Sequence, residues 1–164
     1  MRDLNIYARI CMFELDCLKI KYAKNLTLKV NTRAKTRLGV CKKSGDCYEI
    51  EIAAILLDER TPEEYLKNTL MHELLHTCCG CMKHTGRWKV YADRVNAAYG
   101  YRIQRASPRE ERPLPEDLVP KAKYLIVCDT CGAQYPRQKI SALVRNPEHY
   151  RCGKCGGKLK RVAP

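Results

Sequence analysis

The segment Thr69-Leu70-Met71-His72-Glu73-Leu74-Leu75-His76 carries the pattern H-E-x-x-H within an apolar repeat of helical period. Upstream, Thr61 and Pro62 predict a helix start, and Glu64 completes a capping box with Thr61. Two histidines four residues apart lie on one face of a helix, so His72 and His76 can bind one zinc ion. Glu73 then lies beside the metal as the candidate general base for a water molecule.

A catalytic zinc site usually has three protein ligands and leaves one position open. Only four histidines occur in the chain, and three of them fall within residues 72–84. We expect His84 to be the third ligand, because it follows a helix stop at Gly80 and can fold back toward the metal. Asp93, on the next predicted helix, is the less favoured alternative.

Three cysteines, Cys78, Cys79 and Cys81, share the turn between the second and third histidines. The simplest interpretation is that they are small buried side chains. The alternative is that one thiolate approaches the zinc ion or competes for it.

The residues before this segment predict the rest of the first domain. Apolar spacing predicts a helix over residues 3–23, with Asp3 as its N-cap, and alternation predicts strands over 26–30, 38–41 and 48–52. A further helix is expected from about Thr85 to Gly100. These elements predict an α+β fold: a small antiparallel sheet with an N-terminal helix and two active-site helices.

The C-terminal part predicts a second metal site. A proline-rich linker is expected over residues 106–120, followed by a small Gly- and Cys-rich module over 121–164. Two C-x2-C pairs with 20 residues between them form the usual pattern of a structural zinc site. Its predicted ligands are Cys128, Cys131, Cys152 and Cys155, in a zinc ribbon whose folding depends on the metal.

Charge and cysteine content indicate the compartment and the partner. The 164 residues carry a net charge of +13, with +8 in residues 1–45, −3 in 46–120 and +8 in 121–164. Two basic ends favour a nucleic-acid partner. The sequence shows neither a membrane span nor a signal peptide, so we expect a cytoplasmic, DNA-associated protein whose 11 cysteines serve metal binding or packing.

These motifs together resemble the SprT-like family of zinc metalloproteases (SprT and Spartan). The matching residues are Tyr48–Ile52, Leu56–Leu57, His72–His76, His84–Lys89 and the four ribbon cysteines. The resemblance implies a minigluzincin-like protease domain over 1–105, zinc on His72, His76 and His84, and Glu73 as base. It also implies DNA-stimulated cleavage of DNA-bound proteins, as in DNA–protein crosslink repair.

The sequence therefore predicts a zinc metalloendopeptidase that acts on DNA-bound proteins and holds two zinc ions, one catalytic and one structural. Two alternatives stay open: a non-enzymatic zinc-ribbon DNA-binding or regulatory protein with an idle H-E-x-x-H core, and a zinc hydrolase unrelated to DNA.

The strand Glu49–Ile52, if it lies at a sheet edge, could pair with an extended substrate. Tyr124, Tyr135 and Tyr150 either stack on bases or form the ribbon core.

Overall fold

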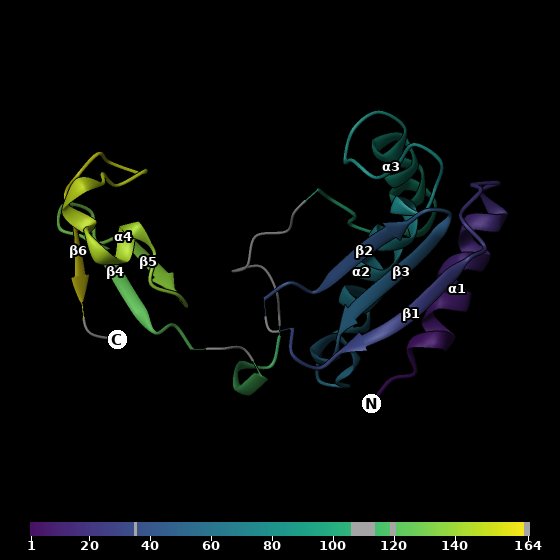
Figure 1. Cartoon of the computed structure of the whole chain (residues 1–164), viewed down its shortest axis with the longest axis horizontal. Coiled ribbons are helices and arrows are strands. Elements are labelled where there is room, and N and C mark those ends of the chain that lie inside the picture. The colour runs from purple at the N-terminus through teal and green to yellow at the C-terminus, as the bar shows by residue number, and fades with distance from the viewer. Residues whose placement is uncertain (35, 106–113, 119–120, 163–164) are drawn as a thin grey trace. The chain divides into compact units, whose positions relative to one another are not determined.

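The computed structural model describes residues 1–34, 36–105, 114–118 and 121–162. The chain divides into two compact units, Met1–Val119 and Pro120–Pro164, which are described separately (Figure 1). Residues 106–113 and 119–120 of the expected linker lie outside the described residues. Residues 114–118, also expected to be linker, instead contain the short helix η3 (Glu116–Leu118), and Leu114 and Leu118 pack against the core of the first unit.

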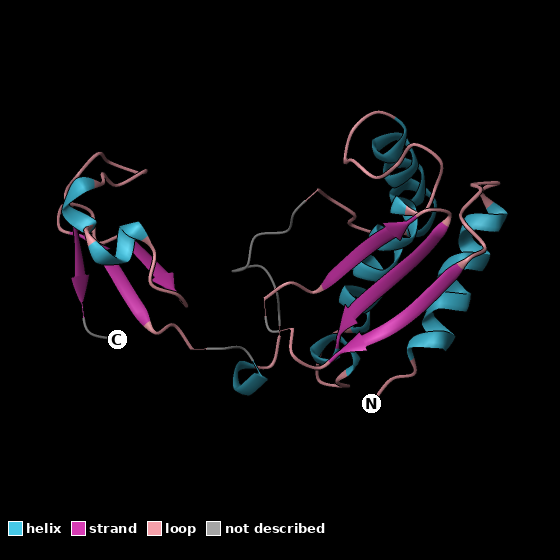
Figure 2. Cartoon of the chain, in the orientation of Figure 1, coloured by secondary structure: helices cyan, strands magenta, loops and turns pink. Residues whose placement is uncertain are grey.

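The first unit contains a three-stranded sheet with the order β1-β3-β2, formed by β1 (Leu26–Asn31), β2 (Gly39–Ser44) and β3 (Cys47–Ala53) (Figure 2). The predicted antiparallel sheet is only partly right, because β1 runs parallel to β3 while β2 is antiparallel to it. β2 follows β1 in the sequence but lies on the other side of β3. The strand that we considered as a substrate-pairing edge is therefore the central strand.

Helices α1 (Leu4–Cys17) and α2 (Glu63–His76) pack together against the sheet, and η1 (Ala54–Leu57) connects β3 to the loop before α2. The other face of the sheet is charged: Lys42 forms ion pairs with Glu49 and Glu51, and Lys29 pairs with Glu49. A sheet with one apolar and one charged face buries its core on the helical side alone.

Two predicted helix boundaries are corrected. The first helix ends at Cys17 rather than near residue 23, because Lys19 adopts a left-handed conformation with φ 56°. The expected capping box before α2 is not formed: the Thr61 hydroxyl instead donates to the Ile55 carbonyl at 2.7 Å. Thr61 is fully buried, so its side chain fixes η1 to the start of α2.

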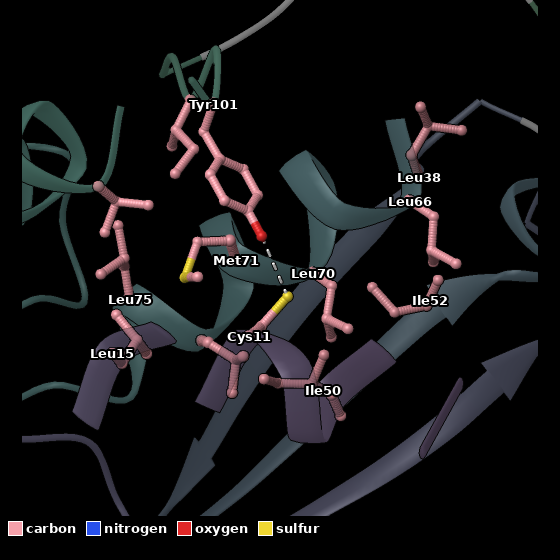
Figure 3. Close-up of a cluster of buried hydrophobic side chains, with 14 of the residues drawn as sticks. Cys11, Leu15, Leu38, Ile50, Ile52, Leu66, Leu70, Met71, Leu75 and Tyr101 are labelled. Carbon is pink, nitrogen blue, oxygen red and sulfur yellow. Dashed lines mark hydrogen bonds between the residues drawn. The ribbon is translucent and has the colours of Figure 1, made fainter. Parts of the chain in front are cut away.

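After α2, the helix α3 (Arg87–Tyr99) ends at Gly100, which has φ 70° as its predicted role requires. The chain then returns through Tyr101, whose ring lies over the buried core with its hydroxyl 3.6 Å from Cys11 Sγ (Figure 3). The same hydroxyl donates to the carboxylate of Glu14, which Lys67 also contacts. Tyr101 thereby anchors the segment that follows it to α1 and α2.

We expect Tyr101→Phe to lower the free energy of unfolding by about 1–3 kcal/mol, because the nearly buried Glu14 carboxylate loses a hydrogen-bond donor. Urea unfolding of the metal-loaded protein measures this change. Tyr91→Phe is the matched control, since no hydrogen bond of its hydroxyl is recorded within the described ranges. Equal stability of the two variants would show that the Tyr101 hydroxyl contributes nothing.

The second unit is a small sheet with the order β5-β4-β6, formed by β4 (Tyr124–Cys128), β5 (Gln134–Arg137) and β6 (Leu159–Val162). The short helices α4 (Ala142–Arg145) and η4 (Pro147–His149) lie between β5 and β6 in sequence. Its apolar core is small and comprises Ile126, Cys128, Val144, Cys152 and Leu159. In the described parts of the chain, no helix is both long and apolar enough to cross a membrane.

Candidate metal centres and the cleft beside them

The structure brings the three predicted histidines of the first unit together. The Nε2 atom of His76 lies 3.3 Å from that of His72 and 3.1 Å from that of His84, and the His72 and His84 Nε2 atoms are 2.8 Å apart. Zn–N bonds of about 2.0–2.1 Å place tetrahedral ligands about 3.3 Å apart. The three nitrogens thus fit one metal ion. Asp93, the alternative ligand, is exposed and outside this group.

Backbone carbonyls orient two of these imidazoles. The Cys81 carbonyl lies 2.7 Å from His76 Nδ1, and a backbone hydrogen bond links His72 to Gln104. A proton on Nδ1 leaves the lone pair of Nε2 directed at the shared centre. Burial lowers the pKa of His72 to about 4 and lowers the pKa of His76 and His84, so all three rings are neutral and suited to bind a metal at pH 7.

Trp88 packs against all three imidazoles. Its ring centroid is 4.9 Å from His72, 5.6 Å from His76 and 4.7 Å from His84. Its indole N–H is buried and has no hydrogen-bond partner among the described residues. The first turn of α3 therefore supplies an aromatic wall that restricts the orientation of the three rings.

Glu73 is 7 % exposed and lies beside this centre on α2. Burial raises the pKa of its carboxyl to about 7, while the backbone N–H of Cys41 and the positive charge of Arg37 oppose that shift. A carboxyl group with a pKa near neutrality can both accept and return a proton at physiological pH.

Gly39, at the start of β2, is a residue that the sequence did not single out. A Cβ atom there would lie 2.7 Å from Glu73 Oε1, 2.9 Å from Glu73 Cγ and 2.8 Å from Thr69 Cγ2. Only glycine lets this strand lie against the Glu73 side chain, so Gly39 fixes where that carboxylate can point. A glycine inside a strand is the sequence signal of such a close approach.

Gly39→Ala is expected to displace the Glu73 carboxylate and to reduce any Glu73-dependent turnover at least about tenfold, with metal content unchanged. Metal analysis and peptide-cleavage rates on the same preparation measure the two effects. Adding Thr69→Ser removes one of the clashing methyl groups and should recover part of the rate. Gly45→Asn is the control, because Gly45 is a φ 58° turn residue with open space around it. Full activity of Gly39→Ala would refute this role.

A cavity of about 390 Å³ opens beside the centre, with His72 and Glu73 in its lining. One wall is formed by residues 36–39 and the other by residues 102–105, and α2 lies between them. The second wall is held in place by the Asn68 side chain, which accepts from the Arg102 N–H at 2.7 Å. Asn96 also exchanges two hydrogen bonds with the backbone of Ile103.

The three cysteines of the turn do not join the histidines. Cys78 and Cys81 are buried, burial raises the pKa of both thiols, and neither belongs to the described group of residues that can hold a metal. The contribution of Cys81 to the site comes from its backbone carbonyl, which contacts His76. The interpretation as packing residues therefore fits Cys78 and Cys81, while Cys79 is exposed.

We expect a triple Cys78→Ser, Cys79→Ser, Cys81→Ser variant to retain the same number of metal ions per folded chain, because the carbonyl of residue 81 is preserved. Metal analysis of the monomeric, folded fraction measures this number. His76→Ala, which removes one of the converging nitrogens, serves as the comparison and should lose one ion. Loss of metal from the serine variant would show that a thiolate takes part.

The four cysteines of the second unit also converge. Cys128 Sγ lies 3.5 Å from Cys155 Sγ, and Cys131 Sγ lies 3.6 Å from Cys152 Sγ. Tetrahedral Zn–S bonds of about 2.3 Å put the sulfurs about 3.8 Å apart, so the four thiols fit one metal ion and form no disulfide.

Tyr135 and Gly157 lie close to the four ribbon cysteines. The Tyr135 hydroxyl lies 3.0 Å from Cys152 Sγ, and this contact lowers the pKa of the Cys152 thiol. Tyr135 and Tyr124 pack on the ribbon core, as in one of our two interpretations, whereas Tyr150 is 40 % exposed. A Cβ on Gly157 would lie 3.0 Å from Cys128 Sγ and 2.3 Å from the Thr130 hydroxyl, so the two cysteine turns approach closely at this glycine.

The fold and the histidine cluster define the class of α+β proteins that carry an H-E-x-x-H helix and a third histidine before the next helix. The sequence model of the SprT-like family matches residues 10–109, and the chain belongs to this family. A "Protein SprT-like" of Bacillus subtilis (strain 168) is 34 % identical over 119 residues, 70 % of each chain. One from Oceanobacillus iheyensis is 33 % identical over 159 residues, 92 % of this chain and 95 % of the relative.

Proposed function

We propose that this protein is a zinc-dependent endopeptidase that cleaves proteins bound to DNA. The observation that carries the peptidase assignment is the convergence of three imidazole nitrogens within 3.3 Å beside a buried glutamate, with His72 and Glu73 lining an open cleft. His72, His76 and His84 would hold the zinc ion, and Glu73 would act on the reacting water.

A zinc ion held by these three histidines supplies a Lewis acid that polarises a peptide carbonyl and lowers the pKa of a water molecule. Glu73 takes a proton from the attacking water on its carboxylate and returns it to the amide nitrogen of the leaving strand. Burial, which raises the pKa of this carboxyl, favours its holding the proton between the two steps. The Trp88 ring and the Cys81 carbonyl keep the imidazoles in place during the reaction.

The strand that can hold an extended substrate is β2, not the central strand β3 that we first considered. β2 pairs with β3 along one side only, and Gly39 at its start contacts Glu73. Backbone hydrogen bonds to a free strand edge bind a peptide without regard to its sequence. Such pairing would present a scissile bond to the histidine centre.

Contact with DNA is the second part of the proposal, and its support is electrostatic. The C-terminal module carries 10 basic and 2 acidic residues, and the basic residues that are exposed include Lys121, Lys123, Lys139, Arg145, Arg151, Lys154 and Lys158. Exposed Tyr150 adds a ring that can stack on an unpaired base. Affinity that depends on such contacts falls steeply as salt rises.

Removing zinc with a chelator and then restoring it, with substrate cleavage as the readout, distinguishes the peptidase proposal from its alternatives. Zinc-loaded protein should cut a DNA-binding substrate protein, lose that activity with a chelator and regain it when zinc is restored. Titrating salt in a parallel oligonucleotide-binding assay tests the DNA contact. Binding of DNA without cleavage of any substrate would favour a non-enzymatic DNA-binding protein, and cleavage without salt-sensitive DNA binding would favour a hydrolase unrelated to DNA.

A further inference from the structure

Arginines gather in the cleft beside the histidine centre. Arg102 and Arg105, on one wall, come from residues 46–120, which carry a net charge of −3, and Arg37, on the other wall, comes from residues 1–45, which carry +8. Among the described residues, the carboxylates that line the cleft are Glu73 and, on the first turn of α2, Glu64. The described lining thus holds three arginines and two glutamates.

These three arginines have no ion-pair partner in the described structure. All three are exposed, and none forms an ion pair within residues 1–34, 36–105, 114–118 and 121–162. Some exposed basic residues of this unit do have acidic partners: Lys29 and Lys42 pair with Glu49, and Arg60 pairs with Asp58. Within the described residues, no carboxylate therefore competes with a ligand for these three guanidinium groups.

The three arginines come from the two segments that line the cleft, residues 36–39 and residues 102–105. Arg37 comes two residues before Gly39, which contacts Glu73, and its charge acts on the Glu73 carboxyl. Arg105 acts electrostatically on His84, and Arg102 is held by its backbone N–H to Asn68. A segment that lies over His72 and Glu73 therefore has arginines among the cleft residues around it.

We infer that this cleft selects peptide segments with acidic side chains, whose carboxylates Arg37, Arg102 and Arg105 bind on either side of the scissile bond. A guanidinium group binds a carboxylate through two parallel hydrogen bonds. The choice of a peptide as ligand rests on the proposed peptidase function, because a nucleic-acid strand in the same cleft would occupy the place of the scissile bond. A cavity of about 390 Å³ accommodates a few residues of an extended peptide.

Binding to an inactive, zinc-loaded Glu73→Gln protein tests the inference without cleavage. The probe is a fluorescent ten-residue peptide containing three Asp or Glu residues, compared with the same peptide carrying Asn or Gln. We expect the acidic peptide to bind at least about tenfold more tightly. Adding Arg37→Gln, Arg102→Gln and Arg105→Gln should remove most of this preference, because three charged contacts are lost together.

A charge-matched control separates local contacts from the net charge of +13. Arg9→Gln, Lys21→Gln and Lys89→Gln remove the same charge from exposed positions outside the cleft. This control should change acidic-peptide affinity less than twofold. Equal binding of the acidic and amide peptides, or equal losses in both triple variants, would overturn the inference.

Two further measurements identify which proposal has failed if the results disagree. If the cleft variants lose oligonucleotide binding but keep the acidic-peptide preference, the arginines serve DNA and the inference is wrong. Cleavage of the amide peptide by the unmodified protein, without a preference in binding, leaves the peptidase standing and refutes the inference. An acidic preference in binding, without cleavage of either peptide or of a DNA-bound substrate protein, supports the binding of acidic segments by the cleft and refutes the peptidase.

Discussion

Glu73→Gln is expected to lower the cleavage rate about 10²–10⁴-fold while the protein keeps its full complement of metal ions. Glutamine fills the same space beside β2 but cannot accept a proton from the attacking water. The three imidazole nitrogens are unchanged, so the histidine centre should still bind its ion. Cleavage rates and metal content, measured on one preparation, test both halves of this result.

Glu63→Gln is the matched control, because Glu63 is an exposed glutamate in the first turn of the same helix. It should leave both the rate and the metal content unchanged. If Glu73→Gln cleaves as fast as the unmodified protein, Glu73 is not the base. If Glu73→Gln loses the metal as well as the activity, the loss of activity does not identify a proton-transfer role.

Cys152→Ser is expected to unfold the second unit and leave the first unit folded. The ribbon has a core of only five buried residues, so its stability depends on a bound metal, whose contribution in such modules is about 10–16 kcal/mol. Cys152 Sγ also lies 3.0 Å from the Tyr135 hydroxyl, and a serine there weakens the metal site and that contact together. Amide NMR spectra would show loss of dispersion for residues 121–162 alone.

Cys47→Ser, an exposed cysteine of the first unit outside both clusters, is the control and should leave all signals in place. A ribbon that remains folded in Cys152→Ser, or after metal removal from the unmodified protein, would show that its small apolar core is sufficient. The two units are compact separately, so unfolding of one is expected to leave the signals of the other unchanged.

The local chemistry of the chain was predictable because it depends on short spacings. An i, i+4 pair of histidines on a helix and two C-x2-C turns have nearly fixed geometry, and the structure brings both sets together. The α+β class was also predictable, because hydrophobic periodicity likewise depends on short spacings in the sequence. His84 was harder to place, since its approach depends on the short turn after α2, yet its nitrogen lies with the others.

The errors concern contacts between residues distant in sequence. No local pattern in the sequence predicts that β1 pairs in parallel with β3. This strand order placed β2 at the edge and made Gly39 a neighbour of Glu73, neither of which spacing alone could reveal. Likewise, net charge counted along the chain missed the arginines that the fold gathers around the cleft.

The two metal centres are tested most directly by counting metal ions per chain in the intact protein and in two cluster variants. The intact chain should hold two zinc ions. A His72→Ala, His76→Ala variant should keep one, and a Cys128→Ser, Cys152→Ser variant should keep the other and retain peptide cleavage. A single ion in the intact chain, or an ion count that the histidine substitutions leave at two, would contradict a metal centre formed by His72, His76 and His84.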